Sequence, residues 1–137
     1  MYKQPIGKLI SMIYRKNQKF LTKELKPYNI GGGGQHSFLI EILLHPGINQ
    51  DQLTHHLRFD KATTARTVKQ LELAGYIERK VDENDRRSYR LYPTQTGVDF
   101  LPILQHILEE ANHRLTKELT EVEGLQLVDL LKKLVDE

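Results

Sequence analysis

Apolar residues recur every three or four positions along Ile6–Leu25 and again along Gln35–Leu44. This spacing lines one side of an α-helix, so the pattern predicts a helix in each segment. Pro27 and the four consecutive glycines at 31–34 separate the two segments, because these residues disfavour a regular helix. Pro46 then ends the second helix.

Two short helices are predicted next, one directly after the other. Asn49 is a good N-cap for a helix that ends near Leu57, and Asp60 is the N-cap of a helix over 61–74. Gly75 follows at the position where a left-handed residue ends a helix. The pattern therefore indicates two tandem helices joined by a tight turn.

The rest of the chain predicts a hairpin and two more helices. Residues 76–81 and 88–92 alternate in polarity and are rich in aromatic and β-branched side chains, with polar turn residues between them. Thr94 is placed to cap a long helix in which Pro102 predicts a bend, and Thr120 is placed to cap the last helix.

The predicted fold class is mainly α with a small β-hairpin wing, in a single domain that spans residues 1–137. Helix, short helix, turn, second short helix and hairpin is the order of a winged helix-turn-helix, in which the second short helix enters the DNA major groove. We expect residues of about 31–94 to form this lobe. The helices of about 1–30 and 95–137 carry broad apolar stripes that must pack on the same domain or on a second copy.

The helical wheel of residues 61–74 separates a buried side from a candidate DNA-binding side. With Thr64, Val68 and Leu71 turned inward, no acidic residue lies on the opposite side. We expect DNA contacts from Lys61, Ala62, Thr63, Arg66, Lys69 and Gln70. Arginine suits guanine, glutamine suits adenine, and Lys61 near the helix start suits a phosphate. The alternative is an ordinary solvated helix surface.

The hairpin loop adds a second candidate DNA contact. It ends in Asp85, Arg86 and Arg87, and arginines at such a tip suit a narrow minor groove. We expect Asp85 to hold Arg87 in place. Asp85 also fits a turn-forming role, and the two roles are compatible.

Charge is distributed unevenly although the net charge of the 137 residues is only +2. The first 29 residues and residues 58–94 are basic, whereas the C-terminal part from residue 95 is acidic. A positive surface is therefore compatible with a nearly neutral chain. The absence of cysteine excludes disulfides, thiol catalysis and zinc-thiolate sites. The N-terminus has neither a signal-peptide core nor an apolar span, so we expect a cytoplasmic protein.

The sequence resembles the MarR family of winged helix-turn-helix transcriptional regulators over nearly all of its length, most densely from Ile48 to Gly97. The residues that carry the resemblance are Leu53, Leu57, Asp60, Lys61, Thr63, Arg66, Val68, Leu71, Gly75, Glu78, Arg79, Asp85, Arg87, Thr94 and Gly97. By resemblance, Ala62, Thr63 and Arg66 lie in the recognition helix, and Asp85 and Arg87 form the wing contact.

The resemblance also implies partners. It implies a homodimer held by the terminal helices, bound to a pseudo-palindromic operator in double-stranded DNA and acting as a repressor. Family members often respond to a small aromatic effector bound between the dimerisation helices and the DNA-binding lobe. Tyr14, Arg15 and Phe38 are candidates to line such a cleft, although core packing explains the two aromatic residues equally well.

Other function classes fit less well. We expect no enzyme, because the chain has no nucleophile elbow, phosphate-loop lysine or His-Glu-x-x-His motif. We also expect no metal and no cofactor, because neither His55 with His56 nor His106 with His113 has the i, i+4 spacing of a helix-borne metal site. The alternative is a site that Glu109 and Glu110 complete with His106 or His113. A winged-helix module that binds protein instead of DNA is the alternative.

Overall fold

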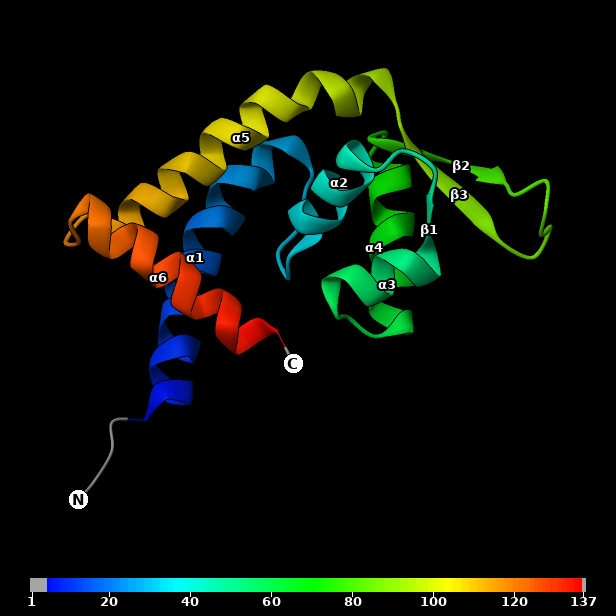
Figure 1. The fold of residues 1–137 in the computed structure, drawn as a ribbon. Helices are drawn as coiled ribbons and strands as arrows, with labels where there is room; N and C mark the ends of the chain where they lie inside the picture. The colour runs from blue at the N-terminus through cyan, green and yellow to red at the C-terminus, as the bar shows by residue number, and fades with distance from the viewer. Residues whose placement is uncertain (1–4, 137) are drawn as a thin grey trace.

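The computed structural model describes residues 5–136 and is mostly helical (Figure 1). Its elements are α1 (Ile6–Leu25), the 3-10 turn η1 (Lys26–Tyr28), α2 (Gln35–Leu44), β1 (Ile48–Asn49), α3 (Gln50–Leu57), α4 (Lys61–Leu73), β2 (Ile77–Val81), β3 (Tyr89–Pro93), α5 (Gln95–Thr116) and α6 (Glu121–Val135). No helix of the described part is long and apolar enough to cross a membrane.

The predicted helices are confirmed, and the predicted capping residues start them. Asn49 and Gln52 form a reciprocal capping box at α3, as do Thr120 and Glu123 at α6. The Thr94 side chain accepts a hydrogen bond from a backbone N–H at the start of α5. Only the boundaries of α4 and of the two hairpin strands differ from the sequence prediction, by one residue.

A short strand, β1, was missed. It pairs antiparallel with β3, Ile48 opposite Leu91, and gives a three-stranded sheet in the order β1-β3-β2. Two residues are too few to give an alternating pattern, so no sequence signal marked this strand. Its pairing anchors the wing to the loop between α2 and α3.

The core lies where α2, α4 and α5 meet the sheet and the second half of α1. Phe38, Leu39 and Ile42 of α2 are fully buried there. Along α5 the buried positions are Phe100, Leu104, Ile107 and Ala111. The three-and-four spacing of the sequence predicts a stripe of Val98, Leu101, Leu104, Leu108, Ala111 and Leu115, of which Val98 is half exposed. The buried side of α5 is therefore rotated relative to the expected stripe.

The end of α4 is joined closely to the start of α5. Gly75 has a φ of 86°, the left-handed conformation that ends α4. The Thr94 hydroxyl donates to the Gly75 carbonyl at 2.6 Å, and the Thr94 N–H donates to the Tyr76 carbonyl at 3.0 Å. A Cβ at Gly97 would collide with that same Tyr76 carbonyl. These contacts fix the direction in which α5 leaves the wing.

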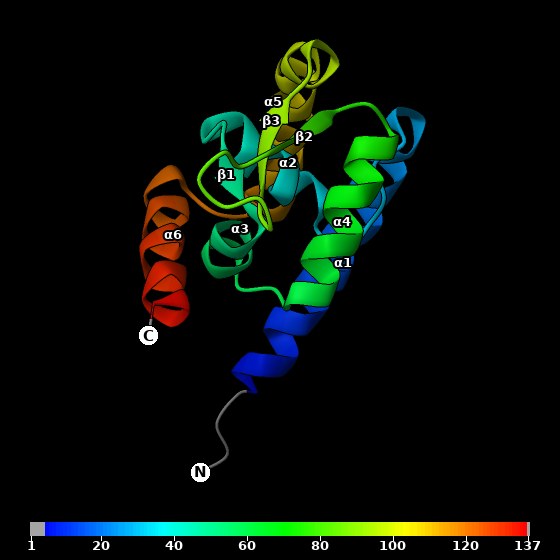
Figure 2. The same ribbon diagram turned by 90° about the vertical axis from the view of Figure 1, so that its right-hand side faces the viewer.

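The two ends of the molecule differ in how well their helices are covered. The wing projects at one end, and α5 runs from it toward the other end, where α1 and α6 lie (Figure 1). Figure 2 shows α6 set apart from α1, on the side of α3. Within the described chain, α6 has no buried residue, and α1 is buried only at Leu21 and Leu25. The terminal helices therefore expose their apolar sides in a single protomer.

Candidate nucleic-acid interface

The first turn of α4 is organised by a chain of polar contacts. The carboxylate of Asp60 accepts hydrogen bonds from the Thr63 N–H at 2.6 Å and from the Thr63 hydroxyl at 3.0 Å. Thr63 Oγ1 in turn accepts from the Arg66 guanidinium at 3.2 Å. The bonds from Thr63 lower the pKa of Asp60, which stays ionised at neutral pH. Arg66 is thus held toward the start of the helix.

The structure places most of the predicted recognition residues on one exposed side of α4. Lys61, Ala62, Arg66 and Lys69 are exposed, and Thr63 is half-buried. The opposite side consists of Thr64, Thr67, Val68 and Leu71, all buried. Thr67 was not among the expected inward residues, and no acidic side chain interrupts the exposed side.

Gln70 lies at the edge of this exposed side. Its Oε1 accepts a hydrogen bond from Gln35 Nε2 at the start of α2, and Gln35 Oε1 accepts from the Gly31 N–H at 2.8 Å. Sequence periodicity could not find this link, because Gln35 and Gln70 are far apart in the chain.

A buried polar contact joins the two helices of the helix-turn-helix. The Thr64 hydroxyl donates to the Asp60 carbonyl at 3.0 Å and accepts from the Thr54 hydroxyl of α3 at 2.8 Å. The buried threonine is therefore fully satisfied. The hydrogen bond from Thr54 thus fixes α3 against α4.

Comparison with known proteins agrees with this geometry. The MarR family model matches residues 34–89. The multiple antibiotic resistance protein MarR of Escherichia coli K12 is 30% identical over 96% of this chain and 91% of its own length. The HTH-type transcriptional regulator YybA of Bacillus subtilis is 33% identical over 80% of this chain and 75% of its own. A MarR transcriptional regulator from Methanosarcina mazei Go1 superposes with a TM-score of 0.89 at 37% identity, covering 96% and 94% of the two chains.

The chain belongs to the MarR family. It is a DNA-binding transcriptional regulator with a winged helix-turn-helix fold, and it is not an enzyme.

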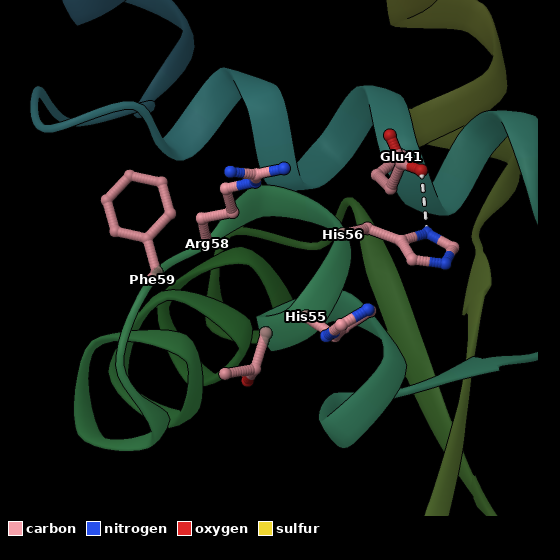
Figure 3. Close-up of a pocket in the computed structure, with 6 residues that line it drawn as sticks. Glu41, His55, His56, Arg58 and Phe59 are labelled. Atoms are coloured by element: carbon pink, nitrogen blue, oxygen red, sulfur yellow. Dashed lines mark hydrogen bonds and ion pairs between the residues drawn. The ribbon is translucent and has the colours of Figure 1, made fainter. Parts of the chain in front are cut away.

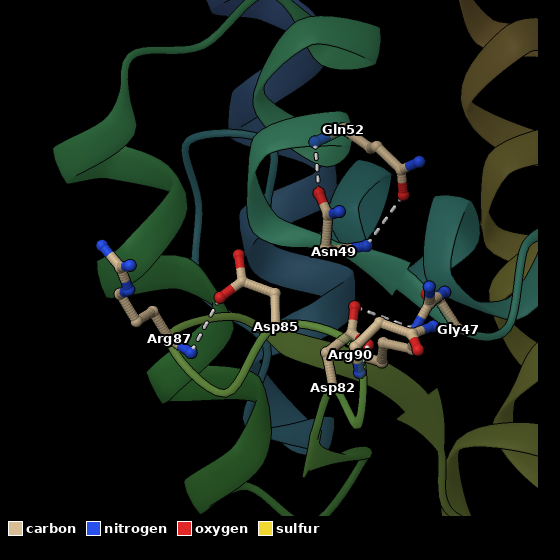
Figure 4. A network of polar contacts seen from close by, with 8 residues as sticks. Gly47, Asn49, Gln52, Asp82, Asp85, Arg87 and Arg90 are labelled. Carbon is tan, nitrogen blue, oxygen red and sulfur yellow. Dashed lines mark hydrogen bonds and ion pairs between the residues drawn. The ribbon is translucent and has the colours of Figure 1, made fainter.

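In this MarR-family protein the wing tip is shaped by Asp85. Its carboxylate accepts a hydrogen bond from the Arg87 backbone N–H at 3.1 Å, and its carbonyl accepts from the Ser88 N–H at 3.0 Å. Figure 4 shows the Arg87 guanidinium directed away from that carboxylate. Arg86 and Arg87 are exposed. Asp85 thus positions Arg87 through the main chain, as a turn-forming residue does.

The base of the wing carries a network that sequence reasoning missed. Arg90 pairs with the nearly buried Asp82 at 3.3 Å and donates to the Gly47 carbonyl at 3.0 Å (Figure 4). Asp82 also accepts from the Asn84 N–H at 2.9 Å. Because Gly47 precedes β1, this network fixes the wing loop relative to the helix-turn-helix.

A shallow polar pocket lies between α2 and α3 (Figure 3). His56 Nδ1 lies 3.1 Å from a carboxylate oxygen of Glu41, and His55 points elsewhere. No group of three metal-ligating side chains is found in residues 5–136. His106, His113, Glu109 and Glu110 are all exposed along α5.

The candidate effector residues are not equivalent in the structure. Phe38 is fully buried, with its ring 5.0 Å from that of Phe59, so it belongs to the core and not to a cleft surface. Tyr14 and Arg15 are exposed on α1. A separate hollow between α1 and α5 is lined by Lys16, Lys19, Phe20, Lys23, Glu24, Glu110 and Arg114.

Proposed function

We propose that the protein is a repressor that binds a pseudo-palindromic operator as a homodimer. The observation that carries this proposal is the exposed, acid-free side of α4 next to a wing tip with two arginines. In this arrangement Arg66 reads a base in the major groove, Lys61 contacts a phosphate, and Arg87 enters the minor groove. A protein-binding winged helix would not need this combination. Because the operator lies on the genome, we place the protein in the cytoplasm.

The terminal helices support the homodimer. Residues of about 1–30 and 95–137 form the proposed dimerisation region, and 31–94 form the DNA-binding lobe. The exposed large apolar side chains of α1 and α6 are Ile6, Leu9, Ile10, Met12, Ile13, Tyr14, Val122, Leu125, Leu127, Val128, Leu130, Leu131, Leu134 and Val135. An apolar surface of this kind requires a partner, and the basic α1 complements the acidic first turn of α6.

The direct test uses the wild-type chain. Sedimentation at micromolar concentration is expected to give a dimer, and a mobility shift is expected on an inverted repeat whose half-site centres lie about one helical turn apart. The DNA next to the protein's own coding region is the first candidate. A monomer that shifts no palindromic duplex would refute the proposal.

The wing gives a prediction of its own. Replacing Arg87 by alanine should weaken operator binding about tenfold, as expected for loss of a hydrogen bond from a charged group. Asp85→Ala should also weaken binding, although it removes a negative charge near phosphate, and the double variant should resemble Arg87→Ala alone. Titrations at one fixed salt concentration measure all three affinities.

Asp85→Asn is the matched control for the wing. Asparagine keeps an oxygen that accepts the Arg87 N–H, so this variant should bind at least as well as wild type. If Asp85→Ala binds as tightly as wild type while circular dichroism shows an intact fold, the positioning role is wrong.

The hollow between α1 and α5 fits an aromatic carboxylate as effector. Three lysines and Arg114 line it beside two carboxylates, Glu24 and Glu110, so its charge is positive on balance. The Arg114 guanidinium lies 4.5 Å from the centre of the Phe20 ring. We expect an aromatic carboxylate such as benzoate to release the wild-type protein from its operator, and Arg114→Ala to lose this response. A response that is unchanged in Arg114→Ala would place the effector elsewhere.

A further inference from the structure

The loop before α2 is connected to the recognition helix through two glutamine side chains. The Gly31 N–H donates to Gln35 Oε1 at 2.8 Å, and Gln35 Nε2 donates to Gln70 Oε1. The polarity of this chain follows from its first member, because a backbone N–H can only donate. Gln35 must therefore turn its oxygen toward Gly31 and its nitrogen toward Gln70. Gln70 then accepts this hydrogen bond through its own side-chain oxygen.

We propose that Gln35 is a specificity-determining residue that fixes which end of the Gln70 amide faces DNA. This inference rests on the proposed function, in which α4 reads the major groove. With its oxygen engaged by Gln35, Gln70 presents Nε2, for which no hydrogen-bond partner is found in residues 5–136. In the major groove a donor finds only acceptors on guanine and thymine, one acceptor beside a donor on adenine, and no acceptor on cytosine. It therefore favours guanine or thymine and disfavours cytosine. The bidentate adenine contact that the sequence suggests is thereby replaced.

The close approach of Gly31 supports a built contact. A Cβ at this position would lie 3.0 Å from Gln35 Nε2, 3.2 Å from Cδ and 3.3 Å from Oε1. Gly31 is not among the glycines with positive φ, so its backbone conformation does not itself require glycine. The absence of a side chain there instead leaves room for the Gln35 amide.

Gln35→Glu is the decisive variant. A carboxylate still accepts the Gly31 N–H but has no donor for Gln70, so the Gln70 amide must turn and present Oε1 to DNA. The preferred base at the position that Gln70 reads should change from guanine or thymine to cytosine or adenine, with about fivefold discrimination. Gln35→Ala and Gly31→Ala should only relax the wild-type preference, because both remove or displace the group that orients Gln70.

Gln52→Glu is the matched control. It makes the same substitution at a glutamine whose Oε1 also accepts a backbone N–H, that of Asn49, at 3.0 Å. The capping box of α3 accepts glutamate equally well, and the added charge is the same. A merely electrostatic effect would weaken binding in both variants without changing the preferred base.

The experiment selects operator sequences from random duplexes with the full-length wild-type protein and then titrates single-base variants. Gln70→Ala identifies the base pair that depends on Gln70, and circular dichroism verifies each fold.

If Gln35→Glu keeps the wild-type preference, or if Gln70→Ala changes no preference while Arg66→Ala does, this proposal fails and the proposed function stands. If wild type selects no sequence, both fail. Should Gln35→Glu not fold, unchanged discrimination in Gln35→Ala and Gly31→Ala overturns the proposal.

Discussion

Leu131→Glu is expected to convert the protein into a folded monomer that has lost operator binding. Leu131 is 43% exposed in the protomer, so the substitution leaves no cavity, and glutamate is a good helix former. In a dimer, the charge would be placed within an apolar interface without a partner, at a cost of several kcal/mol. Loss of the second half-site should lower operator affinity about 100-fold or more. Sedimentation and mobility shift measure the two effects.

Gln126→Glu is the control for this experiment. It adds the same charge to the same helix at an exposed polar position, and it should leave a dimer with wild-type affinity. If Leu131→Glu remained a dimer and bound the operator normally, α6 would not be the dimer contact. If both variants dissociated, the effect would be one of overall charge.

Arg66→Ala is expected to cost about 1–3 kcal/mol on the operator and much less on random duplex DNA. The reason is its geometry: Thr63 and Asp60 hold the guanidinium near the start of α4, the part of a recognition helix that contacts base edges. Titration on both DNAs gives the comparison. Equal losses on operator and random DNA would make Arg66 a phosphate contact.

Lys61→Ala should behave differently from Arg66→Ala. If Lys61 contacts a phosphate, its removal should lower the affinity evenly across sequences and reduce the salt dependence of binding by about one unit of slope. A loss confined to the operator would instead assign Lys61 to base recognition. The two variants together distinguish a phosphate contact from a base contact on the same helix.

The tertiary structure decided the contacts that join distant segments. Gln35 meets Gln70 and Arg90 meets Gly47 across 35 and 43 residues, and such pairs leave no periodic signal along the chain. It also showed that Asp85 acts on the Arg87 main chain, because a sequence gives no side-chain direction. The rotation of the buried side of α5 and the two-residue strand β1 likewise depend on packing against other elements.

The sequence by itself determined the helices, their starting residues and the wing, since these depend on near neighbours. Asn49, Thr94 and Thr120 cap their helices within one turn, and Gly75 ends α4 through its own backbone freedom. Likewise, the exposed side of α4 follows from a 100° rotation per residue, so Ala62, Arg66 and Lys69 could be placed together without coordinates. How Gln70 is held required the fold, because its partner Gln35 comes from another helix, whereas Arg66 is held by Thr63 of its own helix.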